Sequence, residues 1–269
     1  MIAVANRIGA LARRDLTIEL TYPLQLVLRF IGILVGIVMF FFLGRLVGDA
    51  EQLSDYRGGY FEFVLIGLIV MNFSQVAVRA LSRSIQAAQD DGTFEILLAT
   101  PTRLWVLMLG TFAVPLLFAV VDAAFYLVVG WILVGFSVPI GSAALAAVLL
   151  VLTAGTFVAL GLFSASVIVL TKRGDPFASL ALLATQMLAG VLFPVTVLPE
   201  WLQVAARFVP AFYGLRGTRE VVLAGGNLGD VSFDLLILVG CNLVLLPLAL
   251  WTLTRAVRIA RITGTLGNR

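Results

Sequence analysis

The chain has 269 residues, of which 61% are hydrophobic and only 12% are charged, and its formal net charge is +3. A soluble domain is roughly half apolar and about a quarter charged, so this composition excludes a soluble globular protein and indicates an all-α polytopic membrane protein. Histidine is absent, cysteine occurs once and basic residues are scattered, so we predict no catalytic residue, no metal site, no internal disulfide and no nucleic-acid-binding patch.

The first 22 residues have an amphipathic pattern. At about 100° per residue, apolar side chains share one broad arc and the arginines share the other. This pattern predicts a helix in the membrane interface, with its arginines towards anionic headgroups. Asp15 and Glu19 interrupt the apolar arc, so we expect either a water-facing helix end or contact with a basic group on a partner or on the chain's own loops. Charges occur throughout and no continuous apolar core exists, so we expect no cleavable signal peptide.

Six stretches have the roughly 20 mostly apolar residues that a membrane span needs: Leu24–Val47, Tyr60–Leu81, Leu104–Gly135, Ala143–Thr171, Phe177–Leu198 and Phe233–Thr254. The third is longer than the hydrocarbon core, so it could tilt, kink at Pro115 or project beyond the lipid. The longest remaining stretch, residues 199–232, is too short for an independent core. We therefore expect one transmembrane domain over residues 1–269.

Basic residues set the predicted orientation. With the N-terminus inside, twelve arginines and lysines fall on the cytoplasmic side and five on the outer side, which predicts that both termini are cytoplasmic. Arg29 lies near the inner end of the first span and is expected to extend its side chain inward to water. Glu62 and Asp234 lie within a few residues of span ends, where we expect water to reach them.

A short polar island lies within residues 82–103, between the second and third spans. Gly92 is expected to end the preceding helix, and Thr93 to begin one or two further helical turns. Pro101 ends them, because proline disfavours helical geometry at Thr100. So short a helix is marginal alone, and it would be stable only on the membrane surface or docked into a partner. An ordinary interfacial loop is the alternative.

Asp122 is the one acidic residue well inside a predicted span. Ionisable groups are costly in lipid and are functional candidates there. Asp122 could donate a hydrogen bond as a protonated acid, bind a Ser or Thr of a neighbouring helix, or relay protons or ions.

The fifth predicted span is interrupted near its outer end. Residues Gly190–Pro194 are expected to break the helix at membrane depth, and Pro199 follows soon after. Non-helical backbone is tolerated at that depth only where it is buried in protein or lines a cavity. We therefore predict short re-entrant helices in the external region 199–232. The alternative is an external loop anchored by Trp201 and Tyr213.

Two of these segments resemble the permeases of type-2 ABC exporters. The pattern Gly92-Thr93-Phe94-Glu95-x-x-Leu98-x-Thr100-Pro101 resembles their cytoplasmic coupling helix. The second resembles a G-x-x-F-P-x-x-x-L-P pattern followed by re-entrant helices, a P-x-x-Y segment and an arginine, with matches at Gly190, Phe193, Pro194, Leu198, Pro199, Pro210, Tyr213 and Arg219. Arg216 departs from this layout, where a neutral or acidic residue is expected.

The resemblance implies the membrane-spanning permease subunit of an ATP-driven exporter in the cell (inner) membrane. Such a permease moves an amphipathic substrate, which would be a lipid, a lipid-linked glycan or a hydrophobic drug, out of the cytoplasm or inner leaflet. It is not an enzyme. The partners implied are two ATPase subunits, which carry the ATP and Mg²⁺, membrane lipids, and a second permease half, identical or homologous, that completes a dimer. The only lysine, Lys172, lacks the glycines of a Walker A loop, so this chain itself carries no cofactor.

The resemblance also implies roles for particular residues. Those expected to couple to the ATPase are Gly92, Thr93, Phe94, Glu95, Ile96, Leu97, Leu98, Thr100 and Pro101. The interfacial helix is expected to couple to the ATPase through Arg13, Arg14, Asp15 and Glu19. Those expected to form an exit gate for cargo are Phe193, Pro194, Pro199, Trp201, Tyr213 and Arg219.

A proton-coupled secondary transporter that uses Asp122 is the alternative function. A single acid in mid-span, without a histidine, provides few groups for proton transfer across the membrane, and no inverted repeat is evident. An intramembrane aspartyl enzyme is less favoured still, because that chemistry needs two close carboxylates.

Overall fold

Helices form all of the regular structure in the part of the chain that the computed structural model describes, residues 2–48, 59–90, 104–171 and 176–262. This agrees with the expected all-α membrane class. The elements are α1 (Ile2–Thr21), α2 (Pro23–Val47), α3 (Gly59–Asp90), α5 (Leu104–Val134), α6 (Ile140–Thr171), α7 (Pro176–Leu188), η2 (Val195–Val197), α8 (Glu200–Ala206), α9 (Pro210–Arg219), η3 (Glu220–Ala224) and α10 (Ser232–Ile262).

Five of these helices are long and apolar enough to cross a membrane, namely α2, α3, α5, α6 and α10. Each coincides with one of the predicted spans. Two of them continue well past the predicted ends, α3 to Asp90 and α10 to Ile262. Hydropathy marks where a helix leaves the lipid, whereas the helix itself continues as long as its residues favour helical geometry.

The fifth predicted span differs from the expectation. Its helix, α7, has 13 residues and ends at Leu188 rather than Leu198. At about 1.5 Å per residue it is about 20 Å long, which is short of the roughly 30 Å of the hydrocarbon core. The second half of the predicted span is instead a turn and the short 3₁₀ helix η2.

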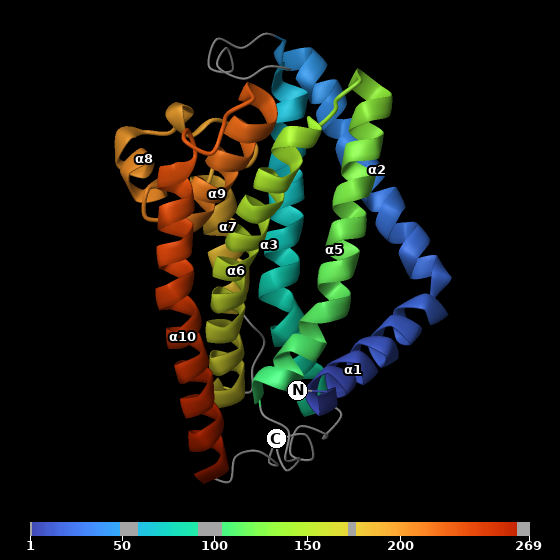
Figure 1. Cartoon of the computed structure of the whole chain (residues 1–269), viewed down its shortest axis with the longest axis vertical. Helices are drawn as coiled ribbons and strands as arrows, with labels where there is room; N and C mark the ends of the chain where they lie inside the picture. The colour runs from blue at the N-terminus through green and yellow to red at the C-terminus, as the bar shows by residue number, and fades with distance from the viewer. Residues whose placement is uncertain (1, 49–58, 91–103, 172–175, 263–269) are drawn as a thin grey trace.

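The helices form an elongated bundle (Figure 1). The start of α1, the end of α6 and the end of α10 lie at one end of it. The helices α8 and α9 and the start of α10 lie at the opposite end. Between the end of α6 and the start of α8, the described chain consists of α7, a turn and η2.

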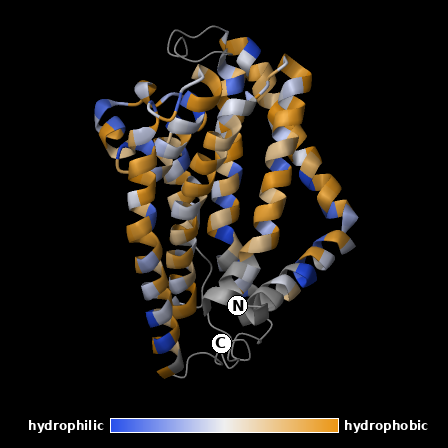
Figure 2. Ribbon diagram, viewed as in Figure 1, coloured by the Kyte–Doolittle hydropathy of each residue, from blue (hydrophilic) through white to orange (hydrophobic). Residues whose placement is uncertain are grey.

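Helix α3 forms the centre of the bundle. In its most apolar stretch 72% of the residues are buried, against 6% in that of α2. It packs most extensively on α6, which packs in turn on α10. Gly161 of α6 allows this closeness, because a Cβ there would lie 2.8 Å from the Val78 carbonyl oxygen and 2.9 Å from that of Ala77. Apolar residues cover much of α5, α6 and α10 in Figure 2.

The amphipathic N-terminal stretch is a helix, as its pattern predicts. Helix α1 runs at a steep angle to α2 (Figure 1) and packs against α5. The chain bends because Pro23 is the first residue of α2 and disfavours helical geometry at Tyr22, whose φ and ψ are −112° and 72°.

Candidate functional site

The coupling segment predicted at Gly92–Pro101 lies outside the described residues. The flanking helices are described: α3 ends at Asp90 and α5 begins at Leu104, at the end of the bundle where α1 lies (Figure 1). Because α1 packs on α5, the interfacial helix and the two attachment points of the coupling segment share one end of the molecule.

The four predicted coupling residues of α1 differ in their surroundings. The carboxylate of Asp15 is held by its neighbour, with Arg14 Nη2 2.8 Å from Asp15 Oδ1. This pairing offsets the cost of an acid on the apolar arc. Arg13 is exposed. Glu19 is half-buried and forms no ion pair with another described residue.

A charged cluster joins α2, α3 and α5 inside the apolar part of the bundle. The guanidinium of Arg29 forms a bidentate ion pair with Asp122, in which Arg29 Nε lies 2.9 Å from Oδ1 and Nη2 contacts Oδ2. Asn72 Nδ2 donates a hydrogen bond to Asp122 Oδ2 at 2.8 Å. The Asp122 side chain is 1% exposed and that of Arg29 is 31% exposed.

This cluster corrects two expectations. Arg29 does not extend inward to water, because it is bound across the helices to Asp122. Asp122 binds Arg29 and an amide rather than a Ser or Thr hydroxyl. A buried carboxylate is costly unless it is paired and hydrogen-bonded, and here both conditions are met.

Helix α7 ends in a Schellman motif. The Gly190 N–H donates to the Met187 carbonyl and the Val191 N–H to the Gln186 carbonyl, both at 3.3 Å. Gly190 has φ +73°, a conformation that costs little only for glycine. The predicted break in the helix is thus confirmed, and Gly190 rather than Pro194 is the residue at which the helix ends.

Arg219 binds the backbone that this break leaves without helical partners. Its Nη1 donates to the Gly190 carbonyl and its Nη2 to the Val191 carbonyl, each at 2.8 Å. Its Nη2 and Nε also donate to the Phe63 carbonyl of α3 at 3.0 and 3.2 Å, and its Cζ lies 3.4 Å from the centroid of the Phe63 ring. Arg219 is 4% exposed, so it anchors the predicted exit gate from within.

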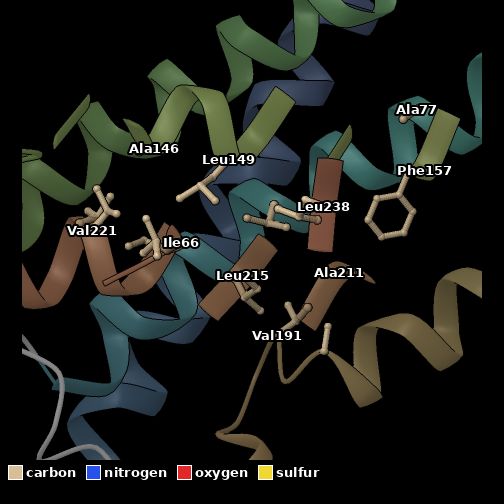
Figure 3. Close-up of a cluster of buried hydrophobic side chains, with 14 of the residues drawn as sticks. Ile66, Ala77, Ala146, Leu149, Phe157, Val191, Ala211, Leu215, Val221 and Leu238 are labelled. Carbon is tan, nitrogen blue, oxygen red and sulfur yellow. The ribbon is translucent and has the colours of Figure 1, made fainter. Parts of the chain in front are cut away.

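The broken segment is also packed into the core. Val191 lies beside Ala211 and Leu215 of α9 in the main buried cluster (Figure 3). On the other side, Gly67 of α3 faces the Val191 carbonyl, which a Cβ at position 67 would strike. The backbone at the break itself, residues 189–191, is therefore buried in protein, which is the condition under which non-helical backbone is tolerated at membrane depth.

The two prolines of the predicted gate begin helices. Pro194 is the N-cap of η2 and Pro199 is the N-cap of α8. The turn between them is held by Gln203, whose Nε2 donates to the carbonyls of Leu198 at 2.8 Å and Thr196 at 3.2 Å. Trp201 is 71% exposed on α8.

Arg216, the residue that departs from the expected layout, has a partner in the structure. Its Nη2 lies 2.5 Å from Oδ1 of Asp234, the acid near the start of α10. Asp234 is buried, so the expectation that water reaches it is wrong. Tyr213, also of the predicted gate, donates its hydroxyl to the Arg207 carbonyl at 2.8 Å and packs its ring against Phe233 of α10.

Sequence reasoning missed Asn72 and both ion-pair partnerships. An arginine and an aspartate inside apolar stretches signal that some partner exists, but the partners are 93 positions apart in one pair and 18 in the other. Of the predicted gate residues, Pro194 and Arg219 line one cavity. Tyr213 is bonded to the Arg207 carbonyl, and Trp201 is exposed.

Comparison with known families gives one finding. A family model described as ABC-2 type transporter matches residues 7–223, from within α1 to within η3. A search of curated proteins finds no match.

Proposed function

The chain belongs to the ABC-2 type transporter family, and we propose that it is the permease of an ATP-driven exporter that moves an amphipathic substrate out of the cytoplasm or inner leaflet. Lipids, lipid-linked glycans and hydrophobic drugs are the cargo classes. As a member of that family it is a multi-pass membrane transport subunit and not itself a catalyst. The family match carries the proposal, because it includes both segments from which the sequence suggests coupling and export.

We propose that transport is driven by a separate pair of ATPase subunits, which bind ATP and Mg²⁺. They would act on residues 92–101 and on α1 through Arg13, Arg14, Asp15 and Glu19. What supports this is that α1, the end of α3 and the start of α5 share one end of the bundle. We propose that this end faces the cytoplasm of the cell and that both termini lie there.

A second permease half, identical or homologous, would complete the exporter. The exposed apolar surface of α2 supports this proposal, because so little of that helix is buried in the single chain. Such a surface must face either lipid or another protein.

We further propose six crossings, with α7 and the segment up to Pro199 as a partly helical fifth crossing and with α8 and α9 re-entering the outer leaflet. The exposed apolar side chains Val204 and Phe208 around the end of α8 support this. Residues Phe193–Tyr213 would then border the exit path, and the anchoring of the break by Arg219 would hold that border in place.

The proton-coupled alternative receives little support from the geometry of Asp122. Both of its oxygens are engaged by Arg29 or Asn72, and the side chain is buried. A relay must exchange protons with water, whereas a buried and fully bonded pair suits a structural role.

The test is purification from the native membrane in mild detergent, followed by reconstitution into liposomes. We expect an ATPase to copurify and export to require ATP. We expect Asp122→Asn to retain ATP-dependence in whatever export it supports. Export that stops on collapse of a proton gradient, without any ATPase in the preparation, would overturn the proposal in favour of the alternative.

A further inference from the structure

A cavity of about 240 Å³ lies at the end of the bundle opposite α1, between α3, η2, α8 and α9. Three arginines line it, Arg207, Arg216 and Arg219, together with Gln203 and Phe63. No acidic side chain is among its described lining residues. The cavity is therefore a cationic pocket beside the broken segment.

The three arginines are held differently. Arg219 is buried and bonded to backbone carbonyls, and Arg216 is paired with Asp234, which offsets its charge. Arg207 is exposed, and no other described residue forms an ion pair or hydrogen bond with its guanidinium. Its backbone is fixed, because its carbonyl accepts the Tyr213 hydroxyl. Arg207 thus presents available donors to the pocket from a held position.

Exposed apolar side chains lie on η2, on α8 and just after α8, the segments that also supply lining residues of the pocket. Val197, Trp201, Val204 and Phe208 are all more than half exposed, with Phe208 at 83%. An anion that fits beside them gains most when it carries an apolar tail. Guanidinium groups match phosphate oxygens in bidentate geometry. Arg207 has its donors available, and the charge of Arg219, which its neutral carbonyl partners do not cancel, adds to the attraction for a phosphate.

We propose that this pocket binds the phosphate headgroup of an anionic amphiphile. Arg207 is the principal residue that binds the phosphate, and the apolar tail of the amphiphile lies along α8. The identification of this ligand as cargo rests on the proposed export function. It restricts the cargo to amphiphiles that carry a phosphate. The binding itself can be measured without any ATPase.

The experiment compares two probes that differ only in the phosphate: phosphatidic acid and diacylglycerol with the same fluorescent acyl chain. Each is titrated onto the purified full chain in detergent. We expect phosphatidic acid to bind more tightly than diacylglycerol. Arg207→Gln should weaken phosphatidic acid binding about tenfold, since it removes a charge-assisted contact, and Arg207→Lys should lose less. Arg45→Gln is the matched control, because Arg45 is an exposed arginine at the end of α2 that does not line the pocket.

Equal affinity for the two probes, or an Arg207→Gln variant that binds like the wild type, would overturn the proposal. Displacement of phosphatidic acid by inorganic phosphate at matched concentration would identify free phosphate as the ligand and overturn the assignment to an amphiphile. Tight, Arg207-dependent binding without ATP-dependent export would instead refute the proposed function and leave the site standing. ATP-dependent export, together with phosphatidic acid binding that does not depend on Arg207, would refute the site and leave the proposed function standing.

Discussion

Arg29 and Asp122 each occupy a position where a single charge would be severely destabilising. Together with Asn72 they satisfy one another, and the three residues come from three different helices. An ion pair of this kind adds little to stability over an apolar core, but removing one member leaves the other buried and uncompensated. The cluster therefore specifies how α2, α3 and α5 fit together.

Removal of one charge should cost more than removal of both. We expect Arg29→Gln to lower the free energy of unfolding by about 3 kcal/mol, at the lower end of the range for buried pairs because Arg29 is partly exposed. The double variant Arg29→Gln/Asp122→Asn should recover most of that loss. The measurement is a double-mutant cycle on denaturant unfolding in mixed micelles. Losses that simply add would show that the two side chains do not interact.

Arg219 illustrates a second use of a buried cation. It donates to carbonyls from two separated segments, Phe63 of α3 and Gly190–Val191 after α7. An arginine suits this task because its planar fork offers five donors, whereas lysine is a point charge. The broken segment is thereby tied to the central helix.

The end of α7 is an element whose geometry depends on one glycine. Gly190→Ala would force a side chain into a left-handed conformation, which costs about 1–2 kcal/mol, and would bring its Cβ within 2.7 Å of Val195 Cγ2. We expect it to raise amide exchange at residues 189–191 and to reduce export. The measurements are hydrogen exchange of that peptide and ATP-driven export.

The double variant Pro194→Ala/Pro199→Ala is the matched comparison. Because both prolines lie beyond the Schellman motif, α7 should still end at Leu188. The starts of η2 and α8 should loosen, export should fall, and ATPase binding at the opposite end should survive. Unchanged export in both this variant and Gly190→Ala would mean that the segment is a passive external loop, and the exit-gate proposal should then be dropped.

The coupling segment is the second element with a direct test. If Phe94, Ile96 and Leu97 dock into an apolar cleft of the ATPase, Leu97→Asp places a charge there at a cost of several kcal/mol. We expect ATPase copurification and export to be lost while the protein still accumulates in the membrane. Leu97→Met is the conservative control. Normal association of the Leu97→Asp variant with the ATPase would refute the assignment.

The described part of the chain begins and ends at the same end of the bundle, since α1 begins and α10 ends there (Figure 1). Because an even number of crossings gives this arrangement, it supports the proposal that the 176–199 region forms a sixth crossing beside the five long helices. The excess of arginines on the α1 side predicts that this end is cytoplasmic.

Cysteine labelling of intact cells tests this orientation. In a Cys241→Ser background, Ser54→Cys should react with a membrane-impermeant maleimide from outside. Gln89→Cys should react only after the cells are permeabilised, because it lies at the α1 end of α3. Reaction of Gln89→Cys in intact cells would mean that the protein is inverted.

Composition and hydropathy alone were sufficient for the membrane class, the positions of five crossing helices and the amphipathic helix at the N-terminus. The reason is that lipid imposes a local requirement: each crossing needs enough consecutive apolar residues, and that can be read without knowing any neighbour. Glycine and proline likewise marked the break after α7, since their backbone preferences are intrinsic.

Partnership between distant side chains could not be read in this way. Arg29 was expected in water and binds Asp122; Asp234 was expected in water and is buried against Arg216; Arg219 holds carbonyls 28 to 156 positions away. Each of these charges is tolerated only because packing brings one particular partner to it, and many pairings satisfy the same local pattern. Which pairing occurs depends on how the helices cross, and that is a property of the folded bundle.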